Sequence, residues 1–372
     1  MKFDITNTAK GSLARIGKLE TPHGDIETPV FMPVATSGAV KTLAPWELKE
    51  LGSQIILGNT YHLHIRPGEN LINEFGGIHE WMNWDAPVLT DSGGYQAFSL
   101  GATKGKLAKI SEDDVRFCSH IDGAKLIFTP EKVIDIQNKL NSDIVMVLDD
   151  CAPYPATDKR LFKAVKRTGE WAKKSIDYWQ KEGIGESGKG LFGIIQGGMN
   201  EELRKQSAKD INDLPFDGIA IGGVSVGEGK ENMDKAVDYV KNDLDPKRPH
   251  YLMGVGEPDD LIRMVHKGID MFDCVLATRL ARHGAFWTKD FKRLDIRKSA
   301  MASDKKPLDE NCNCKTCQNF SRAYLRHLLL QKESLAMRAL SYHNLSILFT
   351  LMEEIKGHIN AGDFTDFYQE YF

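Results

Sequence analysis

The chain has 372 residues, of which 41% are hydrophobic and 27% are charged, and its formal net charge is −4. This composition is that of a globular protein with one large or two ordinary domains, and the charge excludes a uniformly basic surface but not a local basic patch. The longest apolar runs, such as 144–148, are too short to span a membrane. The first residues lack the layout of a signal peptide, so we expect a cytoplasmic protein.

Short apolar runs alternate with amphipathic stretches along the chain. Residues 1–30 are expected to form an N-terminal β extension with a turn at His23-Gly24, and 97–125 a long charged insertion after the third strand of the main sheet. The expected strands of that sheet are 31–35, 54–57, 87–90, 144–148, 191–195, 218–221, 251–253 and 271–273, and the expected helices are 45–51, 129–140, 159–181, 201–210, 230–244 and 258–267. This alternation predicts βαβ units and a parallel sheet.

Eight candidate strands favour a (β/α)8 TIM-type barrel, an α/β fold, over an open doubly wound sheet. Polar and glycine residues follow most of these strands, namely Asp91, Asp149, Gln196, Gly222-Gly223, Gly254 and Asp273. In a barrel all these strand ends share one face, where active sites are built, whereas an open sheet concentrates them at a switch point. The glycines at 254 and 256 are followed by Glu-Pro-Asp, which does not continue into a dinucleotide-binding fingerprint.

We therefore predict three parts. Residues 1–273 form the barrel with its β extension, 274–345 form a basic loop and a zinc-binding subdomain, and 346–372 form a C-terminal helical segment packed on the barrel. The basic loop begins a run from 279 to 298 that holds seven Lys and Arg residues against Asp290 and Asp295. Such a run is more often a solvated face than a phosphate-binding track, and composition does not separate the two.

Three of the six cysteines are clustered, as Cys312-x-Cys314-x-x-Cys317, and 25 residues lie between Cys317 and His343. In a reducing compartment a bound metal is the commonest explanation of such a cluster. Three thiolates and one imidazole complete a tetrahedral Zn²⁺ site and leave no open position, which is the structural type. His327 is the alternative fourth ligand, and His343 is preferred because His327 follows the cysteines closely.

Acidic residues at three strand ends suggest covalent chemistry on a sugar. Asp91 enters a glycine turn, Asp149 and Asp150 follow an apolar strand, and Asp273 lies among apolar residues. A single strand-end aspartate more often caps a turn. Three at one barrel rim favour a pair of acids across a sugar, one nucleophile and one proton shuttle, as in a glycosidase or glycosyl transferase.

Several of these segments together resemble the bacterial tRNA-guanine transglycosylases, also called queuine tRNA-ribosyltransferases. The similarity runs from GNTYHL at 58–63 to His343 and includes DSGGYQ at 91–96, GIIQGG at 193–198, GGVSVGEG at 222–229, FDCVLATR at 272–279 and the cysteine cluster. The resemblance implies a barrel with a zinc subdomain, acting as a homodimer on the anticodon loop of tRNA. The implied reaction exchanges the wobble guanine of GUN anticodons for 7-aminomethyl-7-deazaguanine, in queuosine biosynthesis.

The resemblance also implies residue roles. Asp273 would be the nucleophile that attacks C1′ of the wobble ribose, and Asp91 the general acid and base. Arg279 and Arg282 would contact the anticodon. The base would be read or enclosed by Asp149, Gln196, Gly223, Val224, Tyr95, Met253, Ser92, Glu228 and Cys151, with Cys151 and Val226 matching the bacterial pattern.

This chain departs from the family pattern at four positions. Ala277 stands where Pro is usual, Val224 where Leu is usual, His283 where Asn is usual, and Asp150 where Glu is commoner. Because the glycines and acids are intact, we expect these departures to affect loop rigidity and base affinity only.

Three other functions would account for part of this pattern. A zinc-dependent hydrolase or deaminase needs an open metal position, which a four-ligand cluster beyond the barrel does not offer. A carbohydrate glycosidase explains the paired acids but neither the basic run nor the cysteine cluster. A non-catalytic tRNA-binding subunit should lack the nucleophile, and Asp273 is present.

Overall fold

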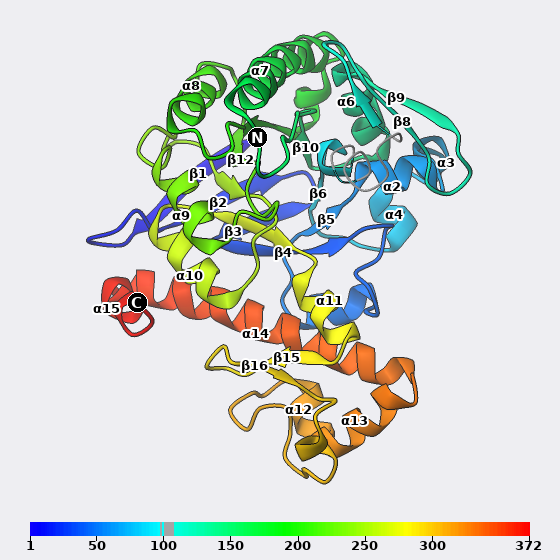
Figure 1. The fold of residues 1–372 in the computed structure, drawn as a ribbon, viewed down its shortest axis with the longest axis vertical. Helices are drawn as coiled ribbons and strands as arrows, with labels where there is room; N and C mark the ends of the chain where they lie inside the picture. Colours follow the sequence, from blue (N-terminus) through cyan, green and yellow to red (C-terminus); the bar gives the residue numbers. More distant parts are fainter. Residues whose placement is uncertain (97–98, 100–107) are drawn as a thin grey trace.

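The centre of the molecule is a closed barrel of eight parallel strands (Figure 1). The computed structural model describes residues 1–96, 99 and 108–372. In barrel order the strands are β4 (Val30–Ala35), β5 (Ile56–Gly58), β6 (Val88–Thr90), β10 (Ile144–Met146), β11 (Gly190–Ile195), β12 (Gly218–Ile221), β13 (His250–Leu252) and β14 (Met271–Cys274), and β14 pairs with β4 to close the ring. The predicted barrel is confirmed, with each expected strand present within two residues at either end.

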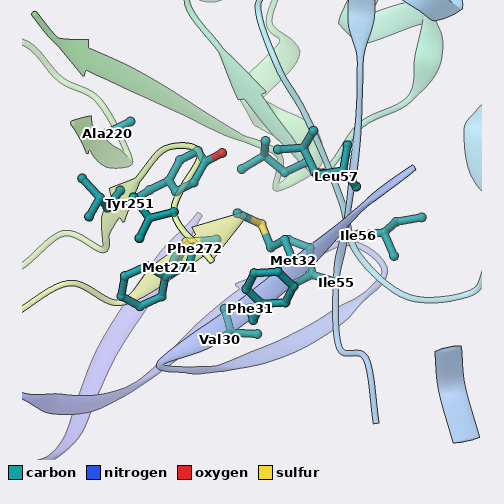
Figure 2. Packing of buried hydrophobic residues seen from close by; sticks show 14 of the residues in the cluster. Val30, Phe31, Met32, Ile55, Ile56, Leu57, Ala220, Tyr251, Met271 and Phe272 are labelled. Atoms are coloured by element: carbon teal, nitrogen blue, oxygen red, sulfur yellow. The ribbon is translucent and has the colours of Figure 1, made fainter. Parts of the chain in front are cut away.

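The barrel strands are mostly apolar because both of their faces are covered. Phe31 and Met32 of β4 and Met271 and Phe272 of β14 are fully buried, as is Tyr251 of β13. Figure 2 shows these side chains packed together in the core beneath the strand ends. Parallel strands buried on both faces read as continuous hydrophobic runs, which is why the runs were visible in the sequence.

Helices surround the barrel, and most of those predicted are confirmed. They are α1 (Pro45–Glu50), α2 (Thr60–Ile65), α3 (Glu69–Glu74), α4 (Ile78–Met82), α6 (Pro130–Leu140), α7 (Asp158–Lys181), α8 (Glu201–Asn212), α9 (Lys230–Asp238) and α10 (Pro258–His266), with a 3₁₀ turn at Ile184–Ser187. Thr129, Thr157 and Asn200 start α6, α7 and α8 as N-caps, each accepting a backbone N–H of the first turn.

One helix is shorter than its pattern predicts. The amphipathic stretch 230–244 was expected to be helical throughout, but α9 ends at Asp238. The chain beyond it tightens into turns, in which Val240 N–H donates to Val237 O and Asp243 N–H to Val240 O. Pro246 follows, and a residue before proline is driven out of the helical region.

Two small sheets flank the barrel. The N-terminal extension is confirmed as the antiparallel sheet β1 (Lys2–Thr8), β2 (Arg15–Thr21) and β3 (Gly24–Thr28), with His23-Gly24 at the second turn. Of the expected insertion, positions 97–98 and 100–107 lie outside the described residues. The rest carries a second antiparallel sheet, β7 (Ala108–Ile110), β8 (Val115–Cys118) and β9 (Lys125–Phe128).

The C-terminal part starts at α11 (Leu276–Arg282), directly after β14. It continues through β15 (Ala285–Trp287), β16 (Arg293–Asp295), a 3₁₀ turn at Ser299–Met301, α12 (Lys315–Asn319), α13 (Arg322–Leu330), α14 (Ser334–Ala361) and α15 (Phe364–Gln369). Figure 1 shows α14 passing between the barrel and the β15–α13 part of the chain. The expected boundary after residue 345 falls inside α14, a single helix. Among the described helices, none is long and apolar enough to cross a membrane.

Candidate active site

Asp91 lies just beyond β6 and is held by three donors. Its Oδ1 accepts the backbone N–H of Thr60 at 2.8 Å, and its Oδ2 accepts the side-chain amides of Asn59 at 2.6 Å and Gln96 at 3.0 Å. The Asp91 carbonyl in turn accepts the Thr60 hydroxyl. The carboxyl group is therefore buried and oriented by the end of the neighbouring strand β5.

Asp273 lies near the end of β14 and is only partly buried. Its Oδ1 accepts the hydroxyl of Tyr251 at 2.6 Å and the backbone N–H of Gly254 at 2.8 Å. Its Oδ2 has no hydrogen-bond partner within the described ranges. One oxygen is thus fixed by protein donors, while the second is left available to react.

Asp149 follows β10 and faces Gln196, which follows β11. The Gln196 side-chain amide donates to Asp149 Oδ2 at 2.7 Å, and the Ser92 hydroxyl donates to Oδ1 at 3.0 Å. A Cβ atom at Gly94 would lie 2.2 Å from Asp149 Oδ1, so only glycine admits this approach of the backbone. A buried acid and a buried amide side by side offer both an acceptor and donors to a planar polar ligand.

Burial raises the pKa of all three carboxyl groups. Desolvation outweighs the hydrogen bonds from Asn59, Thr60 and Gln96 and raises the pKa of Asp91 to about 6. Desolvation likewise raises the pKa of Asp149 to about 6, against the bonds from Ser92 and Gln196. The pKa of Asp273 is raised by burial too, and the Tyr251 and Gly254 bonds oppose that rise. A carboxyl group that titrates near neutrality is suited to proton transfer.

The loop after β12 presents backbone groups next to Gln196. Gly223 has a φ of +64°, and a Cβ there would lie 2.4 Å from Gln196 Oε1. Glu228 is buried and accepts the backbone N–H groups of Val226, at 2.8 Å, and Ser225. The Glu228 carboxylate therefore fixes the backbone conformation of this loop through hydrogen bonds.

The remaining base-site predictions fall at the same rim. Cys151 is buried directly after Asp149-Asp150, and burial raises the pKa of its thiol, so it is an uncharged wall of the site. Val224 is also buried, whereas Met253 is partly buried and Tyr95 is 53% exposed. Asp150 points the other way and pairs with Arg160 and Arg167 of α7.

A cavity of about 310 Å³ opens beside these strand ends. It is lined by the loop after β12, by the Gly254–Gly256 turn and by Cys274. A larger cavity of about 460 Å³ lies at the cysteine cluster instead. The smaller cavity lies next to the strand-end acids, since Cys274 in its lining directly follows Asp273 in β14.

Arg279 and Arg282 occupy the last turn of α11, which begins two residues after Cys274. Arg279 is exposed, while Arg282 is partly buried and its Nε–H donates to Thr278 O at 3.2 Å. His283 is exposed behind them with Nδ1 2.8 Å from Arg279 O, and Ala277 is buried in the helix. Two guanidinium groups therefore stand next to the strand that carries Asp273.

The four residues predicted to bind metal come together. The sulfur atoms of Cys312, Cys314 and Cys317 lie 3.6, 3.5 and 3.3 Å from Nδ1 of His343, and all four ligand atoms are within 4.8 Å of one another. A tetrahedral zinc site requires S···N separations of about 3.5 Å. His343 Nε2 lies 2.7 Å from Trp287 O, which orients the ring with Nδ1 toward the sulfurs. His327 does not belong to this cluster.

A second cluster joins His23, His79 and Asp143 at the opposite end of the barrel. The Asp143 oxygens accept from His23 Nδ1 at 2.7 Å and His79 Nε2 at 3.0 Å, and also from the backbone N–H groups of His23 and Val88. With four donors already on one carboxylate, the cluster is a hydrogen-bonded anchor for the N-terminal sheet.

Sequence reasoning missed most of the groups that orient these acids. Asn59 lies in the GNTYHL motif and Gln96 in the DSGGYQ motif, but neither has a predicted role, and Tyr251 is predicted only as an apolar residue of a strand. The burial of Arg204 could have been predicted from the sequence. Its spacing places it on the same face of α8 as Ser207, Ala208 and Ile211, which is the buried face. A charge at such a position needs a partner in the interior.

Comparisons with known proteins cover the whole of this architecture. A family model described as queuine tRNA-ribosyltransferase matches residues 10–372. Similar proteins of that name occur in Listeria monocytogenes, 49% identical over 372 residues (100% of this chain and 96% of the relative), and in Caldanaerobacter subterraneus, 51% identical over 371 residues (100% and 96%). The one in Bacillus pumilus is 48% identical over 372 residues (100% and 95%). The range matched by the family model spans both the strand-end acids and the cysteine cluster.

Proposed function

Since this chain belongs to the queuine tRNA-ribosyltransferase family and is a tRNA-guanine transglycosylase, we propose that it replaces the wobble guanine of GUN-anticodon tRNAs with 7-aminomethyl-7-deazaguanine. The exchange passes through a covalent ribosyl-aspartate and serves queuosine biosynthesis. The observation that carries the proposal is the pair Asp91 and Asp273, one buried and protonatable, the other with a free oxygen at the rim.

Asp273 acts as the nucleophile. Its Oδ2 attacks C1′ of the wobble ribose, a C–O bond forms, and the C1′–N9 bond breaks with its electron pair leaving on guanine. Asp91 in its protonated form gives that base a proton. The Asp91 carboxylate then takes a proton from the incoming base, which attacks C1′ and displaces Asp273. One glycosidic bond is exchanged for another, so no external energy source is needed.

The base is read at the acid and amide pair. Asp149 and Gln196 supply an acceptor and donors for its polar edge, with Ser92 holding Asp149 in place. Gly223 and Val224 contribute backbone groups, Tyr95 and Met253 cover the two ring faces, and Cys151 and Glu228 line the remainder. A base taken out of its stack needs this combination of apolar faces and edge contacts.

Arg279 and Arg282 contact the anticodon. This role is supported by the position of both arginines at the end of α11, within a few residues of Asp273. The RNA that flanks the reacting nucleotide must pass there. Arginine suits this task because its guanidinium binds phosphates and stacks on unpaired bases.

The cysteine cluster holds one structural zinc ion. The spacing of its four donor atoms fits a tetrahedral ion, and the imidazole is oriented for it by Trp287 O. When bound, the zinc supplies a cross-link without chemistry on the substrate. The residues Cys312, Cys314 and Cys317 thereby tie their loop to His343 of α14.

The enzyme acts as a homodimer. Exposed apolar side chains in the zinc-binding part support this, since Tyr324 and Leu330 of α13 are 43% and 49% exposed. Apolar side chains gathered at a surface are often covered by a partner chain. Sedimentation of the purified protein measures the mass directly.

The proposed function is tested by base exchange. The zinc-loaded protein is incubated with a GUN-anticodon tRNA and labelled guanine, beside Asp273→Asn, and label in the RNA and a denaturant-resistant protein–RNA adduct are measured. Exchange and adduct in the wild type, both absent from the variant, are the expected result. Absence of exchange by folded wild-type protein would sink the proposal, and an adduct in Asp273→Asn would assign the nucleophile elsewhere.

A further inference from the structure

A fully buried arginine clamps the loops on either side of Gln196. Arg204 lies on α8, which packs against β11, and its side chain is 0% exposed. Its Nε–H donates to Gly198 O at 2.6 Å, Nη1 and Nη2 both donate to Gly222 O at 3.1 Å, and Nη2 also donates to Gly223 O at 3.2 Å. One guanidinium thus joins the loop after β11 to the loop after β12.

The Arg204 cation has no ion-pair partner in the described part of the chain. Burial lowers its pKa to about 10, and the charge of Glu228 opposes that decrease, so the group is still a cation at neutral pH. A buried cation is costly to desolvate, and this one is compensated only by carbonyl oxygens. Its charge therefore acts on the peptide groups that it contacts.

The orientation of those peptides has a consequence for their N–H groups. In a trans peptide the C=O and N–H bonds point in opposite directions. Because Arg204 holds the carbonyls of Gly222 and Gly223, the N–H groups of Gly223 and Val224 point away from it. Neither N–H has a hydrogen-bond partner among residues 1–96, 99 and 108–372. Two adjacent donors are thereby presented next to the side chain of Gln196.

We propose that Arg204 is a positioning residue for base recognition, which fixes and polarises the Gly222–Val224 peptides so that their N–H groups bind the exocyclic oxygen of the base. This inference rests on the proposed function and deepens it. A carbonyl that accepts from a cation makes the N–H of its own peptide a stronger donor, because hydrogen bonds in a chain polarise one another. The substrate class is a purine-like base with an oxygen acceptor at the 6-position.

The inference is tested with Arg204→Met and Arg204→Lys. Guanine is compared with 6-thioguanine, which keeps the ring N–H and amino groups but replaces the 6-oxygen with a weaker acceptor, as competitors for labelled guanine. The wild type should prefer guanine, and each variant should lose about three- to tenfold of that preference. The KM for guanine should rise, while the KM for tRNA should not change.

Arg15→Met is the matched control. Arg15 is also buried and donates to two backbone carbonyls, those of Pro246 and Arg248. It belongs to the N-terminal sheet, however, and also donates to Asp270. It should lower the thermal unfolding midpoint without changing the guanine preference. If Arg204 had a purely structural role, its variants would behave like Arg15→Met: the binding of guanine and of 6-thioguanine would weaken equally and the preference would not change. That result would overturn the inference.

A variant that does not fold, and a failure of the proposed function itself, can both be distinguished from a failure of this inference. If Arg204→Met does not fold, Arg204→Lys decides, because lysine keeps the positive charge but has its donors on a single nitrogen and lacks the planar fork of Nε, Nη1 and Nη2 that joins the two loops. An unchanged preference in a folded Arg204→Lys overturns the inference. Failure of the proposed function would appear differently, as absence of guanine exchange by the wild type before any variant is compared.

Discussion

The hydroxyl of Tyr251 donates a 2.6 Å hydrogen bond to Oδ1 of Asp273 across two neighbouring barrel strands. In the β13–β14 pairing Tyr251 lies opposite Met271, two residues before Asp273, so both side chains project from the same face of the sheet. The bond favours the carboxylate form of Asp273, against the burial that disfavours it. Tyr251 thus favours the ionised form of Asp273, the proposed nucleophile, and leaves its second oxygen unengaged.

Tyr251→Phe should therefore lower kcat by about tenfold or more, since a hydrogen bond to a charged group is lost. The pKa of Asp273 should rise, because the Tyr251 bond is one of the two contacts that lower it. A nucleophile must be ionised, so the acidic limb of the pH–rate profile should move to higher pH. The profile of guanine exchange, measured for wild type and variant, checks this.

Tyr239→Phe, at the C-cap position directly after α9, is the control and should leave the profile in place. An acidic limb that stays fixed in Tyr251→Phe, with kcat unchanged, would show that the Tyr251 bond does not act on the nucleophile.

The barrel and the position of the three acids were predictable because both depend on local patterns. Strands buried on two faces appear as apolar runs, and chain direction places the residue after each run at the same rim. Asp91, Asp149 and Asp273 could therefore be assigned to one site before any contact was known. The clustered cysteines were predictable for the same reason, since three ligands within six residues are close in any fold.

The partners of these acids were not predictable from pattern, because they depend on register and on side-chain direction. Tyr251 reaches Asp273 only through the β13–β14 register, and Asn59 reaches Asp91 from the end of another strand. Arg204 was visible as a charge on an apolar helix face, but its carbonyl partners come from two loops that the sequence does not place in space. The end of α9 was mispredicted because amphipathic spacing continues through 239–244 while the backbone tightens into turns.

Asp149→Asn should stabilise the fold at pH 7.5 while impairing base binding. The folded-state pKa of Asp149 is raised to about 6, above its ordinary value near 4. The folded protein therefore binds this proton more tightly than the unfolded chain, and wild-type stability falls as pH rises from about 4 to 6. Asparagine removes the charge, and Ser92 and Gln196 can each reverse their donor and acceptor roles to match it.

The expected gain in the free energy of unfolding is about 1–2 kcal/mol at pH 7.5 and about half of that at pH 5, where the folded carboxyl is mostly protonated while the unfolded one is still ionised. Urea unfolding at both pH values measures it. Equal differences at the two pH values, or a loss of stability at pH 7.5, would contradict the raised pKa.

Removing the metal should destabilise the protein without acting on the chemistry directly. One zinc ion per chain is expected by metal analysis, and Cys317→Ser should lower that content together with the thermal unfolding midpoint. Cys118→Ser, outside the cluster, is the control and should change neither. A Cys317→Ser protein that keeps its metal and its midpoint would show that the four residues do not form a zinc site.

Arg279→Ala should weaken tRNA binding and leave base binding intact. Arg279 is exposed on α11, directly after the strand that carries the proposed nucleophile, so its charge should act on RNA that lies across the rim. Each contact with a single-stranded phosphate contributes about 0.7 to the slope of log affinity against log salt. The KM for tRNA should rise, its salt slope should decrease by about that amount, and the KM for guanine should stay constant. Lys173→Ala removes the same charge at an exposed position of α7 and should alter none of these quantities. If Arg279→Ala and Lys173→Ala have the same salt slope, Arg279 belongs to a solvated face and the RNA takes another path across the enzyme.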